Sequence, residues 1–104
     1  MRYLNGIKKA QNFMRDSKYI KARDILSPLA QDKEGLSKID NPKLKAEFYF
    51  TFAEALKYGS LDDAKLMQQV LESALEANPN HDKARKALDG VLLSQIPAPP
   101  SKLN

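Results

Sequence analysis

The most informative segment of this sequence is the run from Leu44 to Tyr58, LKAEFYFTFAEALKY. It contains no Gly or Pro, and Asn41-Pro42 precede it and Gly59-Ser60 follow it. We therefore expect a helix here, with Pro42 at an early helical position and a break at Gly59-Ser60. Phe48 belongs to one apolar stripe at helical spacing. Each residue of a helix is rotated by about 100° from the one before it, so Phe50 points about 200° away from Phe48 around the helix axis. A helix that is apolar on more than one face is packed from both sides. We therefore predict that this helix lies at the centre of the fold.

Helical periodicity also marks the segments 3–15, 19–30, 61–77 and 82–95. Pro28 lies inside the second of them, so a kink or an early end is expected there. Residues 31–42 are mostly polar, and we expect Leu36 and Ile39 to hold this connector against the core. No segment alternates in the manner of a strand. The sequence therefore predicts an all-α protein of about five helices.

Length and composition indicate one globular domain, with 104 residues, 42% of them hydrophobic and 29% charged. We expect this domain to span residues 1–95 and a proline-rich flexible tail to follow over 96–104, IPAPPSKLN. No run approaches the ~18 apolar residues of a membrane span. The N-terminal segment also lacks the apolar stretch of a signal peptide. The expected location is therefore cytoplasmic.

The positive charge of the chain is concentrated near its N-terminus. Residues 1–24 hold seven basic and two acidic groups, whereas the other 80 residues hold ten basic and eleven acidic groups. Such a distribution is typical of a solvated helix surface or of a basic docking face. We favour the solvated surface and keep the docking face as the alternative.

The residue types present argue against catalysis and against a metal site. The chain has no Cys and a single His, His81, which is too few ligands for a zinc site. We interpret His81, at the start of the last helix, as structural rather than as a catalytic base. The glycines are isolated, so no phosphate-binding loop is present. Glu47 and Glu54 fall on helix surfaces without the buried pairing that acid–base catalysis requires. We expect a non-catalytic protein that uses no cofactor.

Two helix pairs, at 9–30 and 52–80, share a pattern of residues. Each has a small residue in its first helix, a short turn, an apolar residue, and an Ala three positions later. These residues are Ala10, Ser17, Tyr19 and Ala22 in the first pair, and Ala53, Gly59, Leu61 and Ala64 in the second. The pattern resembles the tetratricopeptide repeat, which also has a closing Pro, here Pro79. The ending ALEANPNHDKA resembles the junction between such repeats.

The resemblance implies a right-handed stack of antiparallel helix pairs, with the last helix as a cap. The sequence also departs from the repeat pattern. The second-helix alanines, Ala22 and Ala64, are 42 residues apart, whereas the usual repeat has about 34. Ser17 also stands where the repeat has a turn Gly.

The resemblance further implies that a partner binds along the concave face, which the first helices of the pairs line. The corresponding polar and aromatic positions come from the first, central and last helices. They are Lys8, Gln11, Asn12, Arg15, Phe50, Thr51, Glu54, Lys57, Lys83 and Lys86. For Phe50, burial under the last helix or the connector is an equal alternative to a ligand contact.

We therefore expect an adaptor that binds a peptide or a helix of a partner protein, an acidic one among the options. Nucleic-acid binding by the basic N-terminal pair is a less favoured alternative, because no base-reading motif is present. Self-association as a homodimer is a third interpretation, because two repeats and a cap fall short of the usual three repeats.

Overall fold

The computed structural model describes residues 2–58 and 64–95. Within these ranges the chain forms six helices and no strand, which confirms the all-α prediction. The helices are α1 (Arg2–Arg15), α2 (Tyr19–Gln31), α3 (Lys33–Ser37), α4 (Pro42–Tyr58), α5 (Ala64–Ala77) and α6 (Asp82–Gln95). The expected turn at Gly59-Ser60, the first residues of the helix predicted over 61–77, and the tail 96–104 lie outside the described residues, as do the side chains of Ala64 and Gln95.

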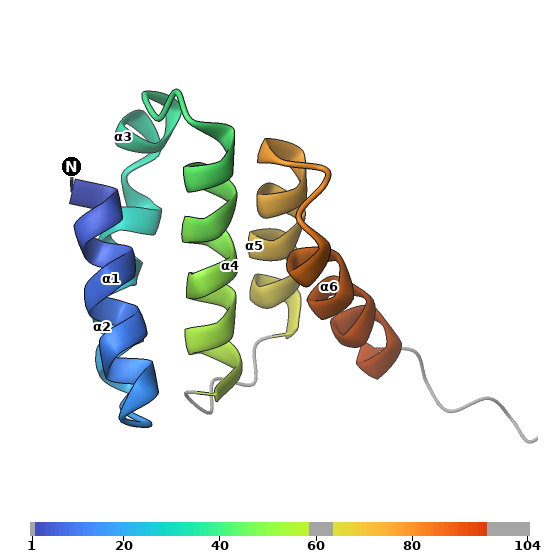
Figure 1. Ribbon diagram of the computed structural model, residues 1–104. Coiled ribbons are helices and arrows are strands. Elements are labelled where there is room, and N and C mark those ends of the chain that lie inside the picture. Colours follow the sequence, from blue (N-terminus) through green and yellow to red (C-terminus); the bar gives the residue numbers. More distant parts are fainter. Residues whose placement is uncertain (1, 59–63, 96–104) are drawn as a thin grey trace, which may run out of the picture.

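Helix α4 is the centre of the molecule (Figure 1). It packs against α1 and α2 on one side and against α5 on the other, and α5 in turn packs against α6. Phe48, Phe50 and Phe52 are all buried, although they point to different sides of α4. The Tyr3 ring of α1 meets the Phe48 ring edge-on, with 5.2 Å between the ring centroids. The prediction of a central helix covered on both sides is confirmed.

Helices α1 and α2 approach each other closely at Gly6. A Cβ atom at this position would lie 2.6 Å from Cδ1 of Leu29. Tyr3, Ile7 and Ala10 are buried, as the apolar stripe of this helix predicts. The need for glycine at position 6 was not predicted, because it depends on which helix packs opposite.

The connector between the two pairs contains a short helix, α3, where the polar sequence indicated a connector with at most one extra helical turn. The Asp32 carboxylate caps it by accepting a hydrogen bond from the Gly35 N–H at 3.0 Å. Leu36 is buried and Ile39 packs against the core, as expected. Pro28 does not end α2 early, because the helix continues to Gln31.

Helix α4 begins where the sequence predicted, with Pro42 as its first residue. The Asn41 side chain caps it, because Oδ1 accepts hydrogen bonds from the N–H groups of Lys43 at 3.0 Å and Leu44 at 3.2 Å. The capping fixes the entry into the central helix.

Helix α6 follows its predicted bounds but buries less of its apolar face than expected. Helical spacing places Leu92 on the same apolar face as Ala84, Leu88 and Val91. Ala84 and Val91 are buried, whereas Leu92 is 39% exposed. The reason is that α6 packs mainly on α5, and its C-terminal end leans away from α4 (Figure 1). None of the helices in the described part is long and apolar enough to cross a membrane.

Candidate functional site

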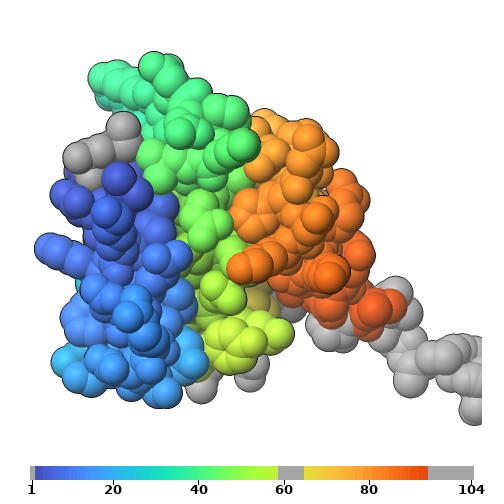
Figure 2. Space-filling model, viewed as in Figure 1, coloured from blue at the N-terminus to red at the C-terminus, as the bar shows by residue number. Residues whose placement is uncertain are grey.

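Because α6 leans away from α4, a groove lies between these two helices. We call it the first groove. It encloses about 660 Å³, and α4, α5 and α6 supply most of its lining. Gln11 of α1 is also part of the lining. In Figure 2, α1, α4 and α6 share the visible face, and the surface is hollowed between the C-terminal part of α4 and α6.

Apolar and small residues form much of the first groove. They are Phe50 and Ala53 of α4, Met67 and Leu71 of α5, and Ala87, Gly90 and Val91 of α6. A Cβ atom added at Gly90 would meet no other atom within 4 Å, so the groove is open at this point. An apolar side chain entering here would therefore find apolar partners on three helices.

Charged groups line the same groove. Glu47 and Glu54 come from α4, whereas Lys83 and Lys86 come from α6. The pKa of Glu54 is raised because its carboxylate is partly desolvated and because Glu47 is nearby; the charges of Lys83 and Lys57 oppose this effect. The α4 wall therefore carries both carboxylates together with the ammonium group of Lys57, and the α6 wall carries two ammonium groups.

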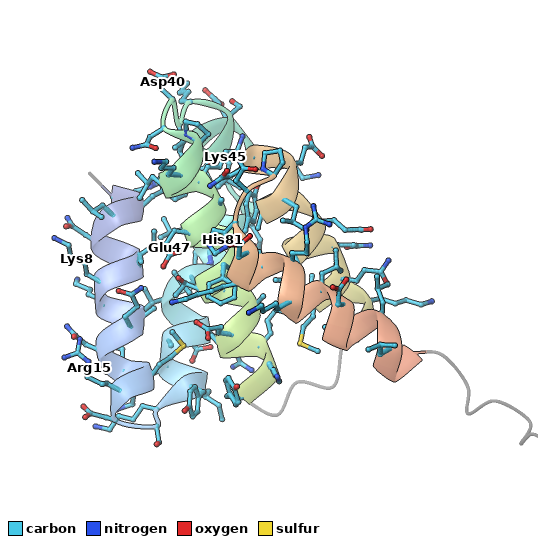
Figure 3. All side chains as sticks on the ribbon, turned by 45° about the vertical axis from the view of Figure 1, so that its right-hand side comes forward. Lys8, Arg15, Asp40, Lys45, Glu47 and His81 are labelled. Carbon is cyan, nitrogen blue, oxygen red and sulfur yellow. The ribbon has the colours of Figure 1, made fainter. Side chains whose placement is uncertain are left out.

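His81 joins the two walls at the start of α6. Its Nδ1 accepts a hydrogen bond from the Ala84 N–H at 3.1 Å, and its Nε2 lies 3.0 Å from Oε1 of Glu47. Figure 3 shows His81 and Glu47 pointing toward each other. The His81 ring also packs on Phe50, with centroids 5.0 Å apart, and Gln11 Nε2 donates to Oε2 of Glu47 at 3.5 Å. These contacts connect α1, α4 and α6 at the groove.

Six of the ten predicted binding residues line the first groove. They are Gln11, Phe50, Glu54, Lys57, Lys83 and Lys86. Phe50 is buried beneath His81, with an exposed fraction of 8%, as the first of its two alternatives predicts. It also contributes to the groove lining, and a ligand contact there stays a prediction.

The other four residues lie elsewhere. Lys8 and Arg15 are exposed on the outer side of α1 (Figure 3). Arg15 donates a hydrogen bond to Asn12 at 3.0 Å, so these two side chains contact each other. Thr51, predicted on the binding face, is instead fully buried, because α4 is covered around most of its circumference. Its hydroxyl is not accessible to a ligand.

The sequence did not predict Glu47, Met67, Ala87 or Gly90 as groove residues. For Ala87 and Gly90 a signal was present, since they follow Lys83 at the i+4 and i+7 positions of one helix face. For Glu47 no signal existed, because its partner His81 is 34 residues away in the chain.

Among the described residues, no group of three or more His, Cys, Asp or Glu side chains could hold a metal ion. Comparisons with protein-family models, with curated proteins and with solved structures find no match to this chain. What the first groove can bind therefore follows from its own geometry and charge.

Proposed function

We propose that this chain is a non-catalytic protein-interaction module of the tetratricopeptide-like type, and that it binds a peptide or a helix of a partner protein in the first groove. The order of packing supports the repeat assignment, because α1 packs with α2, α4 with α5, and α6 follows on α5. Ala10, Ala22 and Ala53, at three of the repeat-like positions, are buried.

The observation that carries the binding proposal is the combination of an apolar lining with charged groups of both signs, the carboxylates coming from α4 and two of the ammonium groups from α6. An amphipathic segment suits such a groove, because its apolar side chains would cover Phe50 and Met67 while its charged side chains would meet Lys86 on one wall and Glu54 on the other. A partner that carries charges of one sign alone would place some of them beside like charges in this groove.

The hydrogen bonds of His81 support a structural role for this residue. Both ring nitrogens are engaged, Nδ1 with the Ala84 N–H and Nε2 with Glu47. A general base needs a free lone pair directed at its substrate. The nitrogen lone pair of the neutral ring, on Nδ1, accepts the Ala84 N–H and so caps α6. No lone pair of the ring is therefore directed at a substrate.

The proposal can be tested with a displayed peptide library selected against the folded chain. A selected peptide is then measured against the variants Gly90→Ala and Gly90→Leu. Leu has nearly the helix propensity of Ala, and there is open space beyond Gly90, so both variants should fold. The Ala variant should bind within about twofold of the unsubstituted chain, whereas the Leu side chain fills the groove and should weaken binding by about tenfold or more.

Charge reversal at Lys83 and Lys86 provides a second measurement on the same peptide. A loss of affinity with unchanged helicity would support the α6 wall as part of the site. Equal binding by the Leu and Ala variants of Gly90, or the recovery of no peptide from the library, would overturn the proposal.

A further inference from the structure

Helix α4 has a second groove on the side opposite the first. This second groove encloses about 730 Å³ and is lined by residues of α2, α3, α4 and α5. Phe50 belongs to the first groove and Phe52 to the second. These two residues are about 200° apart around a helix at about 100° per residue. The two grooves therefore present separate surfaces.

The second groove also has an apolar floor. Phe52 and Leu56 of α4 and Val70 of α5 are buried beneath it, and Tyr49 is half-buried at its side. The Tyr49 ring is held edge-on to Phe48, with centroids 5.7 Å apart. An apolar side chain placed here would extend the existing core.

The charged residues that line the second groove are all basic. Its lining contains Arg23 of α2, Lys33 of α3 and Lys45 of α4, and no Asp or Glu. The remaining polar lining residues are serines and glutamines. Arg23 pairs with Asp24 at 2.8 Å, whereas neither Lys33 nor Lys45 forms an ion pair with any residue in the described ranges. The first groove differs, because Glu47 and Glu54 line it.

We propose that the second groove binds an acidic segment of a partner protein that carries an apolar anchor side chain. Carboxylates of the segment would pair with Lys33 and Lys45, which come from two different helices, and the anchor would rest on Phe52 and Val70. A single-stranded nucleic acid would need exposed aromatic faces for its bases. The one aromatic residue at the side of this groove, Tyr49, is packed against Phe48.

The test uses a fluorescein-labelled synthetic peptide in which glutamates flank one leucine. Its binding to the full chain is measured by fluorescence anisotropy at low and at physiological salt, because exposed ion pairs are screened. The variant Lys33→Glu/Lys45→Glu should lose about tenfold or more in affinity. Both substitutions fall near a helix N-terminus, where a carboxylate is favourable, so the fold should be retained.

The variant Lys83→Glu/Lys86→Glu is the matched control, because it changes the net charge equally but lies in the first groove. It should bind the acidic peptide within about twofold of the unsubstituted chain. Replacing the peptide leucine with serine should weaken binding by about tenfold, since the anchor is lost. Amide shifts in NMR spectra should change at Tyr49, Phe52 and Val70.

Three outcomes would overturn the proposal. Equal losses in the two double variants would indicate attraction to net charge alone. A larger loss in the Lys83/Lys86 variant would place the peptide in the first groove. Displacement of the peptide by a single-stranded DNA oligonucleotide of the same charge, together with tolerance of the leucine-to-serine change, would identify a nucleic-acid surface instead.

Discussion

His81 Nε2 lies 3.0 Å from Glu47 Oε1 and so links the residue preceding α6 to the N-terminal half of α4. Because His81 Nδ1 accepts the Ala84 N–H, this nitrogen carries no proton, and Nε2 must be the donor to Glu47. One imidazole in a single tautomer therefore caps α6 and also fixes one end of the first groove.

Replacing His81 with Ala should lower the free energy of unfolding by about 2 kcal/mol, because a helix cap contributes about 1 kcal/mol and a hydrogen bond about 1 kcal/mol. The variant His81→Asn keeps a capping acceptor but cannot reach Glu47, so it should recover about half of this loss. Urea unfolding would measure both values. Equal stability of the Ala and Asn variants would contradict the capping role.

Ser17 has a backbone φ of 61°, in the left-handed region. It closes α1 in a Schellman motif, in which the Lys18 N–H donates to the Phe13 carbonyl at 2.8 Å and the Ser17 N–H donates to the Met14 carbonyl at 3.0 Å. A side chain in this conformation costs about 1 kcal/mol, so Ser17→Gly should raise the free energy of unfolding by about 0.5–1 kcal/mol.

The control for this prediction is Ser17→Ala, which keeps a Cβ atom at the same φ. It should give no gain in stability. Both variants can be compared by the urea concentration at the midpoint of unfolding. The comparison requires that the unfolding free energy depends on urea concentration with the same slope in each variant. A gain that is as large for Ala as for Gly would show that the left-handed backbone is not the cause.

The sequence was sufficient to predict features that depend on local pattern. The central helix, its start at Pro42 and the bounds of α6 follow from periodicity and breaking residues, and the structure agrees with them. Ser17 stands where the resembled pattern has glycine, and its backbone has a φ of 61°, which glycine adopts without strain.

Features that depend on which helices meet could not be predicted from the sequence. Gly6 is needed because Leu29 lies opposite it, and Leu92 is exposed because α6 leans away from α4. The repeat resemblance places Thr51 on the binding face, whereas the structure buries it, because neighbouring helices cover α4 around most of its circumference. The same limitation applies to the second groove, whose lysines come from separate helices.

Thr51 is fully buried, and its hydroxyl has no hydrogen-bond partner among the described residues. A buried polar group without a partner costs about 1–3 kcal/mol. We therefore expect Thr51→Val, which keeps the shape and removes the hydroxyl, to raise the free energy of unfolding by about 1 kcal/mol. Thermal and urea unfolding would measure the change.

The matched variant Thr51→Ser keeps the hydroxyl and removes a buried methyl group, so it should lower stability by about 1 kcal/mol. A Val variant less stable than the unsubstituted chain would mean that the hydroxyl is satisfied, for example by a water molecule. The two substitutions together separate the effect of polarity from the effect of volume.

Burial raises the pKa of Glu54 above its ordinary value of 4.5, with Glu47 adding to the effect. The folded state therefore holds this proton more tightly than the unfolded state, and stability falls as pH rises from the ordinary pKa through the folded one. Glu54→Gln should accordingly raise the melting temperature at pH 7 by a few degrees and have little effect below about pH 4, where the carboxyl is protonated in both states. Exposed Asp89→Asn is a suitable control, since it removes an acidic charge that lies outside the groove lining and away from the helix N-terminus. If Glu54→Gln lowers the melting temperature at pH 7, the attraction of Lys83 and Lys57 outweighs desolvation, and the α4 wall is stabilised rather than strained by its charge.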